Sequence, residues 1–268
     1  MHSNKISSVQ IQLAEILNKI PSEKWQMIVR NEPEWQHLEP IRKIFPQGAF
    51  SVFMLAVGLN AYQLKGKAEM AYWYRLYEHF KDCGSIPSLE VLEEYLVRFY
   101  QKERIYNLKI GRLLKFLNSQ LANELWKKSP REIADATLTI WKKLSKTMNQ
   151  APHEKTICFA MKCLGISLMM ADEYDFDFNG IPIPVDSRIK KFTNNLGIDF
   201  GENIQPMQDF WDDVLTSLRQ TLPQINMIHL DSLIWQIAHH DAHELMAYFE
   251  TLAIYDVGES LSQYLFQS

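Results

Sequence analysis

Apolar residues recur at helical spacing along almost the whole chain. One stripe consists of Val9, Leu13, Ile16, Leu17 and Ile20, and a second consists of Leu89, Leu92, Leu96 and Phe99. Intervals of three and four residues place such side chains on one face of an α-helix, where they can pack against a core. The alternation of apolar and polar residues that is typical of strands is nearly absent. The pattern therefore predicts an all-α protein.

Proline and glycine divide this pattern into helix-sized pieces of about 10 to 18 residues, from which we expect roughly ten helices. The breakers are Pro21, Gly66, Pro130, Pro152, Gly197 and Pro223, together with the segments 46–48, 84–87 and 180–184. The clearest helix start is Ser129-Pro130-Arg131-Glu132, in which Ser129 can cap the helix and Glu132 can complete a capping box. We predict that this helix runs to about Lys146.

The composition is that of a folded protein without a membrane span. The chain has 268 residues, of which 47% are hydrophobic, enough to bury a substantial core. Its longest apolar run, 157–170, is interrupted by Lys162 and is shorter than the roughly 18 residues that a span requires. Residues 1–12 lack the apolar stretch of a secretory signal. We therefore expect a cytoplasmic protein, associated with the nucleoid if its source is prokaryotic, and no membrane partner.

Two further features of the composition narrow the function. The cysteines Cys83, Cys158 and Cys163 are too few for a disulfide framework, a four-cysteine zinc site or an iron-sulfur cluster, and we expect reduced core thiols. The net charge of -4 conceals an uneven distribution, since 201–268 holds ten acids and one base, whereas 101–146 holds eleven bases and four acids. Such asymmetry is typical of a protein that presents a basic face to phosphates, although charged helices are often simply solvated.

A polar connection at 147–154 separates two helical patterns and predicts a hairpin followed by a helix that begins near Lys155. The positive end of the helix dipole disfavours a second positive charge there, and partial burial would act in the same direction. We therefore expect this amine to lose its proton more easily than a surface lysine, which would make it a nucleophile. The alternative is a lysine that merely extends into solvent. Phe159 and Lys162 follow at intervals that place them on the same helical face.

An extended proline segment, 181–185, leads to Asp186, which is a natural N-cap for another helix. Arg188, Lys190 and Lys191 follow in the first turns of that helix, where positive charge costs stability. Phosphate binding would explain these three bases. The alternative is that Asp186 only caps its helix.

Together these features resemble the helix-hairpin-helix DNA glycosylases that have lyase activity. The archaeal GO glycosylase branch is the most similar. Three parts of the chain carry this resemblance, in the same order as in that branch: Lys155-Thr156 with Phe159, the segment 181–186, and the segment 229–235. Segments 31–35 and 64–73 extend the resemblance over most of the chain. It implies an all-α fold with two subdomains and an active site in the cleft between them. The whole chain, 1–268, would form one glycosylase unit, with the hairpin motif at about 130–170 and the aspartate segment at 181–197.

The resemblance also implies an activity, the excision of 8-oxoguanine from DNA and a nick made by β-elimination. Lys155 would form a Schiff base, Asp186 would be the catalytic aspartate, and Phe159 and Trp235 would enclose the flipped base. The remaining site residues would be Trp73, Lys162 and Asp231 in the pocket wall and Arg188, Lys190 and Lys191 on DNA phosphates. This chemistry requires neither a metal nor a redox cofactor, and we expect a monomer. Without the resemblance, the aromatic residues would be interpreted as core.

The chain departs from the family in two places. The hairpin at 147–154 contains no glycine, although glycines usually bring hairpin N–H groups against phosphate. In the segment Glu32-Pro33-Glu34, a glutamate stands where the archaeal branch carries glutamine. We therefore expect Glu34 to recognise the base in a different way. The alternative is that Glu34 faces solvent and only caps a helix.

Two other classes of function compete with this interpretation. His239 and His243 are four residues apart and His229 is nearby, so a metal-dependent hydrolase is one alternative. A non-catalytic helical module that binds duplex DNA and ignores the lesion is the other.

Overall fold

The computed structural model describes residues 2–64 and 68–266, and this part of the chain forms sixteen α-helices and one 3-10 helix without any strand. The all-α prediction is therefore confirmed, but the helices are more numerous and shorter than the roughly ten that we expected. Gly66, one of the predicted breakers, lies outside the described residues. No helix in the described part combines the length and the apolar content that crossing a membrane requires.

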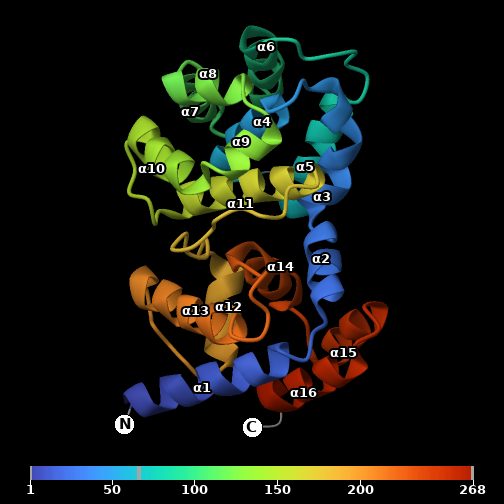
Figure 1. Cartoon of the computed structure of the whole chain (residues 1–268), viewed down its shortest axis with the longest axis vertical. Helices are drawn as coiled ribbons and strands as arrows, with labels where there is room; N and C mark the ends of the chain where they lie inside the picture. Colours follow the sequence, from blue (N-terminus) through green and yellow to red (C-terminus); the bar gives the residue numbers. More distant parts are fainter. Residues whose placement is uncertain (1, 65–67, 267–268) are drawn as a thin grey trace. The chain divides into compact units, whose positions relative to one another are not determined.

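The contacts divide the chain into two compact units (Figure 1). The terminal unit consists of Met1–Glu32 and Pro182–Ser268, and the central unit consists of Pro33–Ile181. The terminal unit contains α1 (His2–Leu17), α2 (Ser22–Arg30), α12 (Ser187–Asn195), α13 (Ile204–Leu218), α14 (Met227–Ile237), α15 (Ala242–Thr251) and α16 (Tyr255–Phe266). The central unit contains α3 (Pro33–Leu38), η1 (Glu39–Ile44), α4 (Ala49–Leu59), α5 (Ala68–Phe80), α6 (Leu89–Tyr100), α7 (Tyr106–Leu117), α8 (Gln120–Trp126), α9 (Pro130–Ala134), α10 (Thr137–Met148) and α11 (Lys155–Met170).

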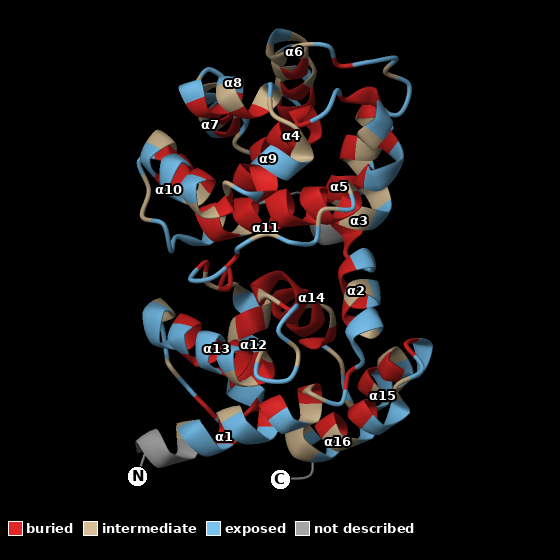
Figure 2. Cartoon of the chain, viewed as in Figure 1, coloured by how far each residue is buried: buried red, intermediate tan, exposed pale blue. Residues whose placement is uncertain are grey.

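The core of the central unit is built on α4 and α11, which pack against each other (Figure 2). Every residue of α4 is buried. Near its end, Gly58 allows a close approach, because an added Cβ would lie 2.9 Å from the Cys163 sulfur and 3.0 Å from the Ala160 Cα. Near its start, the hydroxyls of Ser51 and Ser167 are 2.8 Å apart. The two helices therefore run in opposite directions, and this contact fixes α11 within the unit.

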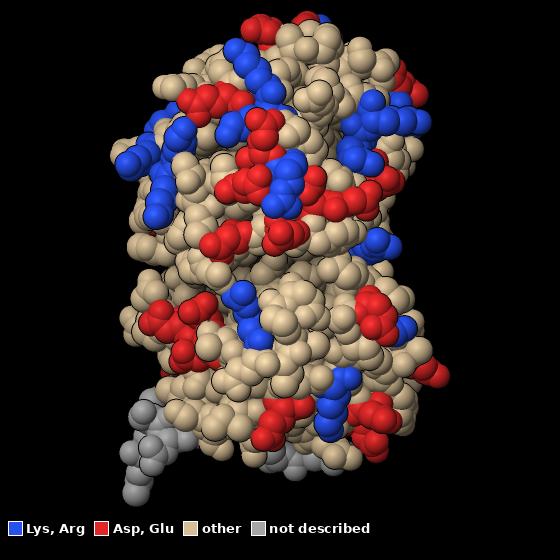
Figure 3. Space-filling view, viewed as in Figure 1, with Lys and Arg blue, Asp and Glu red and all other residues tan. Residues whose placement is uncertain are grey.

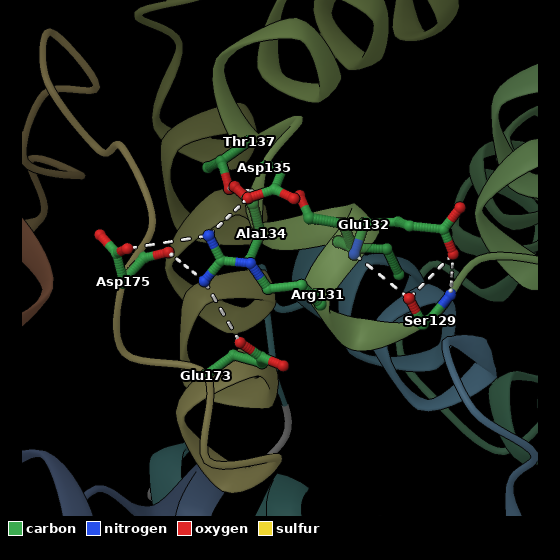
Figure 4. Close-up of polar contacts among 9 residues, drawn as sticks. Ser129, Arg131, Glu132, Ala134, Asp135, Thr137, Glu173 and Asp175 are labelled. Atoms are coloured by element: carbon green, nitrogen blue, oxygen red, sulfur yellow. Dashed lines mark hydrogen bonds and ion pairs between the residues drawn. The ribbon is translucent and has the colours of Figure 1, made fainter.

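The helix predicted from Pro130 to about Lys146 is divided into α9 and α10. Its start is as predicted, because Ser129 and Glu132 form a capping box (Figure 4). The single-helix prediction is wrong because the Thr137 hydroxyl donates to the Ala134 carbonyl at 2.9 Å, and Ala136 leaves the helical conformation. A side-chain hydrogen bond of this kind offers the backbone an alternative to the helical ladder.

Arg131 joins α9 to the segment that follows α11. Its guanidinium lies 2.7 Å from Asp135, 3.6 Å from Glu173 and 3.7 Å from Asp175 (Figure 4). One basic residue from the stretch 101–146 is therefore paired with carboxylates of its own unit.

In the terminal unit, α1 packs against both α13 and α16, and its residues Val9, Leu13 and Leu17 are buried as the sequence pattern predicts. Polar bonds connect the remaining helices. The Trp211 indole donates to the Thr193 hydroxyl at 3.1 Å, which joins α13 to α12. The Gln236 amide donates to the Ile28 carbonyl at 2.9 Å, which joins α14 to α2. Residues from both ends of the sequence thus form one core.

Candidate active site

Lys155 is the first residue of α11, directly after the hairpin, as predicted. Its side chain is exposed, whereas Ile157 and Cys158 are buried. The expectation of partial burial at Lys155 is therefore wrong, because the inward face of α11 begins two residues later. The amine at this helix start is open to solvent and can be reached by a substrate.

An aromatic pair lies one turn further along α11. The ring centroids of Phe159 and of Trp73, on α5, are 6.4 Å apart, with an angle of 40° between the ring planes. Lys162 is buried, and its Nζ lies 5.9 Å from the centre of the Phe159 ring. Trp73 is also buried, whereas Phe159 is half-buried. Only the Phe159 ring therefore keeps a partly open surface for a ligand.

Glu34 lies in the first turn of α3, a helix that contacts both α5 and α11. Its side chain is buried, with 3% of the residue surface exposed. The alternative in which Glu34 faces solvent is therefore excluded. A carboxylate near a helix N-terminus is favoured by the helix dipole. Glu34 belongs to the same unit as Lys155, Phe159 and Trp73.

The hairpin adopts its turn without glycine because Asn149 takes the left-handed conformation, with φ 55° and ψ 48°. Asparagine is one of the few residues that tolerate this region. The backbone of the next residue, Gln150, is fixed by a side chain, because its carbonyl accepts a hydrogen bond of 2.6 Å from the Ser145 hydroxyl. Specific side chains therefore maintain the turn.

Arg112, on α7, connects this hairpin to the start of α11. Its Nη2 donates to Gln150 Oε1 at 2.9 Å and lies 3.4 Å from the Thr156 hydroxyl. The guanidinium also lies 5.4 Å from the centre of the Tyr62 ring. The sequence does not reveal this positioning residue, because neither the spacing nor the charge of Arg112 distinguishes it from its basic neighbours.

Asp186 of the terminal unit caps α12, as predicted. Its Oδ1 accepts hydrogen bonds from the N–H of Arg188 at 2.8 Å and of Ile189 at 3.0 Å. No hydrogen bond from the described residues reaches Oδ2. The side chain is half-buried. One carboxylate oxygen therefore holds the helix, and the other remains available to a ligand.

Asp231 and Trp235 lie one turn apart on α14, with Asp231 buried and Trp235 half-buried. The Arg188 guanidinium lies 4.0 Å from the centre of the Trp235 ring, and its Nη1 donates to the Trp235 carbonyl at 2.9 Å. Asp186, Arg188 and Trp235 are therefore joined within one unit by α12 and α14.

His229 anchors α14 from the inside. Its Nε2 lies 3.2 Å from the Gln26 amide of α2, and its Nδ1 lies 3.0 Å from the Asn226 side chain that caps α14. Burial lowers the pKa of His229 to about 4. The ring is therefore neutral at physiological pH, and it connects α2 to the helix that carries Asp231.

Two lysines follow Asp186 on α12, and both have partners. Lys190 forms an ion pair with the exposed Glu202, and Lys191 Nζ donates to His239 Nδ1 at 3.0 Å. An exposed ion pair such as that of Lys190 contributes little stability. The hydrogen bond of Lys191 is also exposed, so both amines can exchange these partners for an anion.

Comparison with known proteins identifies the family of the chain. The model of the AGOG family, described as N-glycosylase/DNA lyase, matches residues 14–260. The chain belongs to the AGOG family.

Individual AGOG relatives agree with this assignment. An N-glycosylase/DNA lyase of Methanopyrus kandleri is 26% identical over 212 residues, which are 75% of this chain and 78% of that protein. An N-glycosylase/DNA lyase of Methanococcus maripaludis is 32% identical over 96 residues, which are 35% of this chain and 33% of that protein. The fold is similar to the 8-oxoguanine DNA glycosylase of Pyrobaculum aerophilum in complex with 8-oxoguanosine, with a TM-score of 0.74, 20% identity and 96% coverage of both chains.

AGOG membership, which spans both units, leaves the metal-dependent hydrolase without support. Among residues 2–64 and 68–266, no group of three or more His, Cys, Asp or Glu side chains is placed to hold a metal ion. His239 contacts Lys191, and Asp241 and Glu244 form the capping box of α15. The histidine-rich segment that suggested a metal site is thus a helix start.

Proposed function

We propose that this AGOG protein is a bifunctional DNA glycosylase and AP lyase that excises 8-oxoguanine and nicks the strand. The observation that carries the proposal is an exposed amine, Lys155, on the first residue of the buried helix α11, one turn before the half-buried Phe159. An N-glycosylase/DNA lyase family is the expected setting for a lysine nucleophile. The Pyrobaculum aerophilum protein bound to 8-oxoguanosine supports the choice of base.

The reaction begins with a flipped nucleotide, because the glycosidic carbon is inaccessible in a stacked duplex. The neutral Lys155 amine attacks the sugar C1′, and the bond from C1′ to 8-oxoguanine breaks. Positive charge develops on the sugar as the base leaves. The Asp186 carboxylate, through its free Oδ2, stabilises this charge and assists proton movement.

The lyase step follows from the same covalent intermediate. The sugar ring opens, and C1′ and the Lys155 nitrogen form a Schiff base. Loss of a proton from C2′ then expels the 3′ phosphate by β-elimination, which cuts the strand on the 3′ side of the lesion. No oxidation or reduction occurs, and water then hydrolyses the Schiff base and releases the Lys155 amine.

The other candidate residues recognise the substrate in this proposal. Phe159 and Trp235 stack on the two faces of the flipped base. The walls of the pocket are formed by Glu34, Trp73, Lys162 and Asp231. The phosphates next to the lesion are contacted by Arg188, Lys190 and Lys191. In this proposal the enzyme acts as a monomer in the cytoplasm, associated with the nucleoid if its source is prokaryotic.

Borohydride trapping tests the proposal, because the reagent reduces a Schiff base to a stable protein–DNA adduct. We expect an adduct with DNA that contains 8-oxoguanine and none with the Lys155→Gln variant. Since Lys155 is exposed, this variant should melt at the same temperature as the parent. Lys162→Gln removes the other lysine of this helix face but keeps the candidate nucleophile, so it should still form the adduct, more slowly because Lys162 lines the pocket. If Lys155→Gln traps and Lys162→Gln does not, the nucleophile has been misassigned.

A further inference from the structure

Arg188 makes two contacts with one residue, Trp235, from the start of a helix, where the helix dipole disfavours positive charge. Its guanidinium stacks on the Trp235 indole at 4.0 Å, and its Nη1 donates to the Trp235 carbonyl at 2.9 Å. This carbonyl lies in the last turn of α14, where carbonyl groups lack an intrahelical partner. A cation at the end of a helix is also favoured by its dipole. Arg188 therefore holds both the backbone and the ring of Trp235.

The stack limits how Trp235 can bind a base. An indole has two faces, and a guanidinium 4.0 Å from the ring centre covers one of them. A purine can then stack only on the opposite face. The cation also offsets the negative charge of the indole face, which favours stacking of the opposite face on the negative face of a purine.

The same side chain couples two parts of the candidate site. Arg188 lies two residues after Asp186, and its own N–H is bonded to Asp186 Oδ1. Its backbone is therefore tied to the aspartate and its side chain to the indole. The group that acts on the sugar and the ring that holds the base are thus connected through a single residue.

We propose that Arg188 is a positioning residue for base recognition, which supports the Trp235 indole from behind and sets its distance from Asp186. The inference rests on the proposed function, because it requires that Trp235 stacks on the flipped base. Arg188 is already proposed to contact a phosphate. Support of the Trp235 indole is a second role, and this role does not depend on phosphate.

Binding of the nucleoside 8-oxoguanosine separates these two functions, because a nucleoside has no phosphate. Calorimetric titration of Arg188→Ala with 8-oxoguanosine should give a dissociation constant about tenfold higher than that of the parent, as expected for loss of a stacked cation. Arg188→Lys should fall between the two, since lysine keeps the charge but lacks the planar fork. Arg98→Ala is the matched control, because Arg98 also lies over an aromatic ring, Tyr95, and has an acidic partner, Glu94. It should bind the nucleoside like the parent.

A second experiment distinguishes an error in the role of Arg188 from an error in the proposed function. It compares trapping on DNA that contains an abasic site with release of 8-oxoguanine. With saturating DNA that contains an abasic site, no base remains to be stacked, so Arg188→Ala should reduce the rate of borohydride trapping by a smaller factor than it reduces the release of 8-oxoguanine. Single-turnover release of 8-oxoguanine should be slowed in the same variant. If the parent traps neither substrate, the proposed function is wrong.

The inference would be overturned if the parent protein forms the trapped adduct and Arg188→Ala binds 8-oxoguanosine as tightly as the parent does. Weaker DNA binding alone would then identify Arg188 as a phosphate contact only. If Arg188→Ala melts at a lower temperature than the parent, Arg188→Met replaces it in the test, because methionine retains the aliphatic stem. The same tenfold loss of nucleoside binding is expected for it, and parental binding by Arg188→Met would overturn the inference equally.

Discussion

At the scale of single residues, Asp186 illustrates how one carboxylate can have both a structural and a chemical role. Both capping bonds go to Oδ1, and Oδ2 accepts none from the described residues. Capping requires only one acceptor oxygen, and a neutral amide oxygen can supply it. Stabilisation of a positive sugar requires the negative charge of the whole group. The two roles can therefore be separated by a substitution.

Asp186→Asn should lower the rate of base release by about two orders of magnitude, or about 3 kcal/mol of transition-state stabilisation, with little change in melting temperature. The asparagine oxygen keeps the cap, but the charge is lost. Single-turnover kinetics and thermal melting measure the two effects. Asp241→Asn is the matched control, because Asp241 caps α15 in the same way, and its rate should equal that of the parent. A variant Asp186→Asn that melts early yet keeps its rate per folded molecule would make Asp186 purely structural.

Glu34→Gln should reduce discrimination between 8-oxoguanine and guanine. The oxidised base carries a hydrogen on N7, whereas guanine has a lone pair there. A carboxylate only accepts hydrogen bonds, but an amide can also donate, so the glutamine variant can accommodate both bases. Single-turnover rates on the two DNAs should show a smaller ratio in the variant. Glu39→Gln, an exposed glutamate of η1, should behave like the parent. Identical rates and ratio in Glu34→Gln would show that Glu34 does not recognise the base.

The sequence predicted those residues whose function depends on near neighbours. Ser129 and Asp186 were expected as caps, because a cap acts on N–H groups within three positions of itself. It did not predict that Arg188 lies on Trp235, because the two residues are 47 positions apart and only the packing of α12 on α14 brings them together. The burial of Glu34 depends in the same way on its helix packing against α5 and α11.

At the scale of elements, the hairpin is held by its neighbours rather than by its own sequence. Asn149 provides the left-handed turn residue that the missing glycine would otherwise supply. The Arg112 guanidinium then holds Gln150 from α7. The hairpin and the helix start at Lys155 were predictable from the polar segment at 147–154. The Arg112 contact was not, because it joins residues 38 positions apart.

His229 should make the stability of the protein fall as the pH is lowered from about 6.5 towards 4. Its pKa is about 4 in the folded protein and near the ordinary value of 6.5 when the chain unfolds. Between these values the unfolded chain binds a proton that the folded protein does not, so acid favours unfolding. The loss from this one group is about 2 kcal/mol at pH 5. Burial also lowers the pKa of His37, His79 and His240, which act in the same direction.

Denaturant midpoints measured from pH 7.5 to pH 4.5 test this expectation. His229→Gln should be less stable than the parent at pH 7.5 but should have a flatter profile across the range. His243→Gln, in which an exposed histidine is replaced, should keep the parental profile. A profile for His229→Gln that is as steep as that of the parent would assign the acid sensitivity to other groups.

At the scale of the whole molecule, fewer basic residues are free to bind DNA than the sequence suggests. Lys and Arg side chains gather over α8 and α10 (Figure 3). Within the basic stretch, however, Lys109 is fully buried, Lys143 pairs with Glu124, and Arg131 pairs with three carboxylates. Counting charges along a sequence cannot detect such burial and pairing, because Glu124, Glu173 and Asp175 reach these basic residues only through the packing of the chain.

Binding of DNA that contains 8-oxoguanine should weaken steeply with salt, and replacing both Lys190 and Lys191 by alanine should reduce the slope. Each phosphate contact contributes about 0.9 to the slope of log K against log salt, so we expect a decrease of about 2. Fluorescence anisotropy from 50 to about 300 mM salt measures it. Replacement of Lys81 and Arg98, which pair with Glu78 and Glu94 close by in the sequence, is the control and should leave the slope unchanged. A parental slope in the Lys190 and Lys191 variant would place the DNA elsewhere.

The all-α class followed from the spacing of apolar residues, because helical periodicity survives in every long segment of the chain. The division into two units did not follow from a linker, since neither boundary, 32/33 or 181/182, lies in a flexible polar stretch. The chain passes from one unit to the other at Glu32-Pro33 and at Ile181-Pro182. In the sequence, each of these prolines indicates only the local end of a helical pattern. Which helices share a core depends on contacts between distant segments.

The terminal unit has a consequence for how the chain folds as it is synthesised. The central unit is continuous from 33 to 181, so all its helices have been synthesised before the last third of the protein is made. In contrast, α1 packs on α13 and α16, and α2 packs on α14. The first two helices must therefore wait, with apolar faces uncovered, until the end of the chain emerges. Domains generally fold as units, so a released chain that ends at residue 181 should hold a folded centre and an unpaired N-terminal arm that is a natural substrate for chaperones.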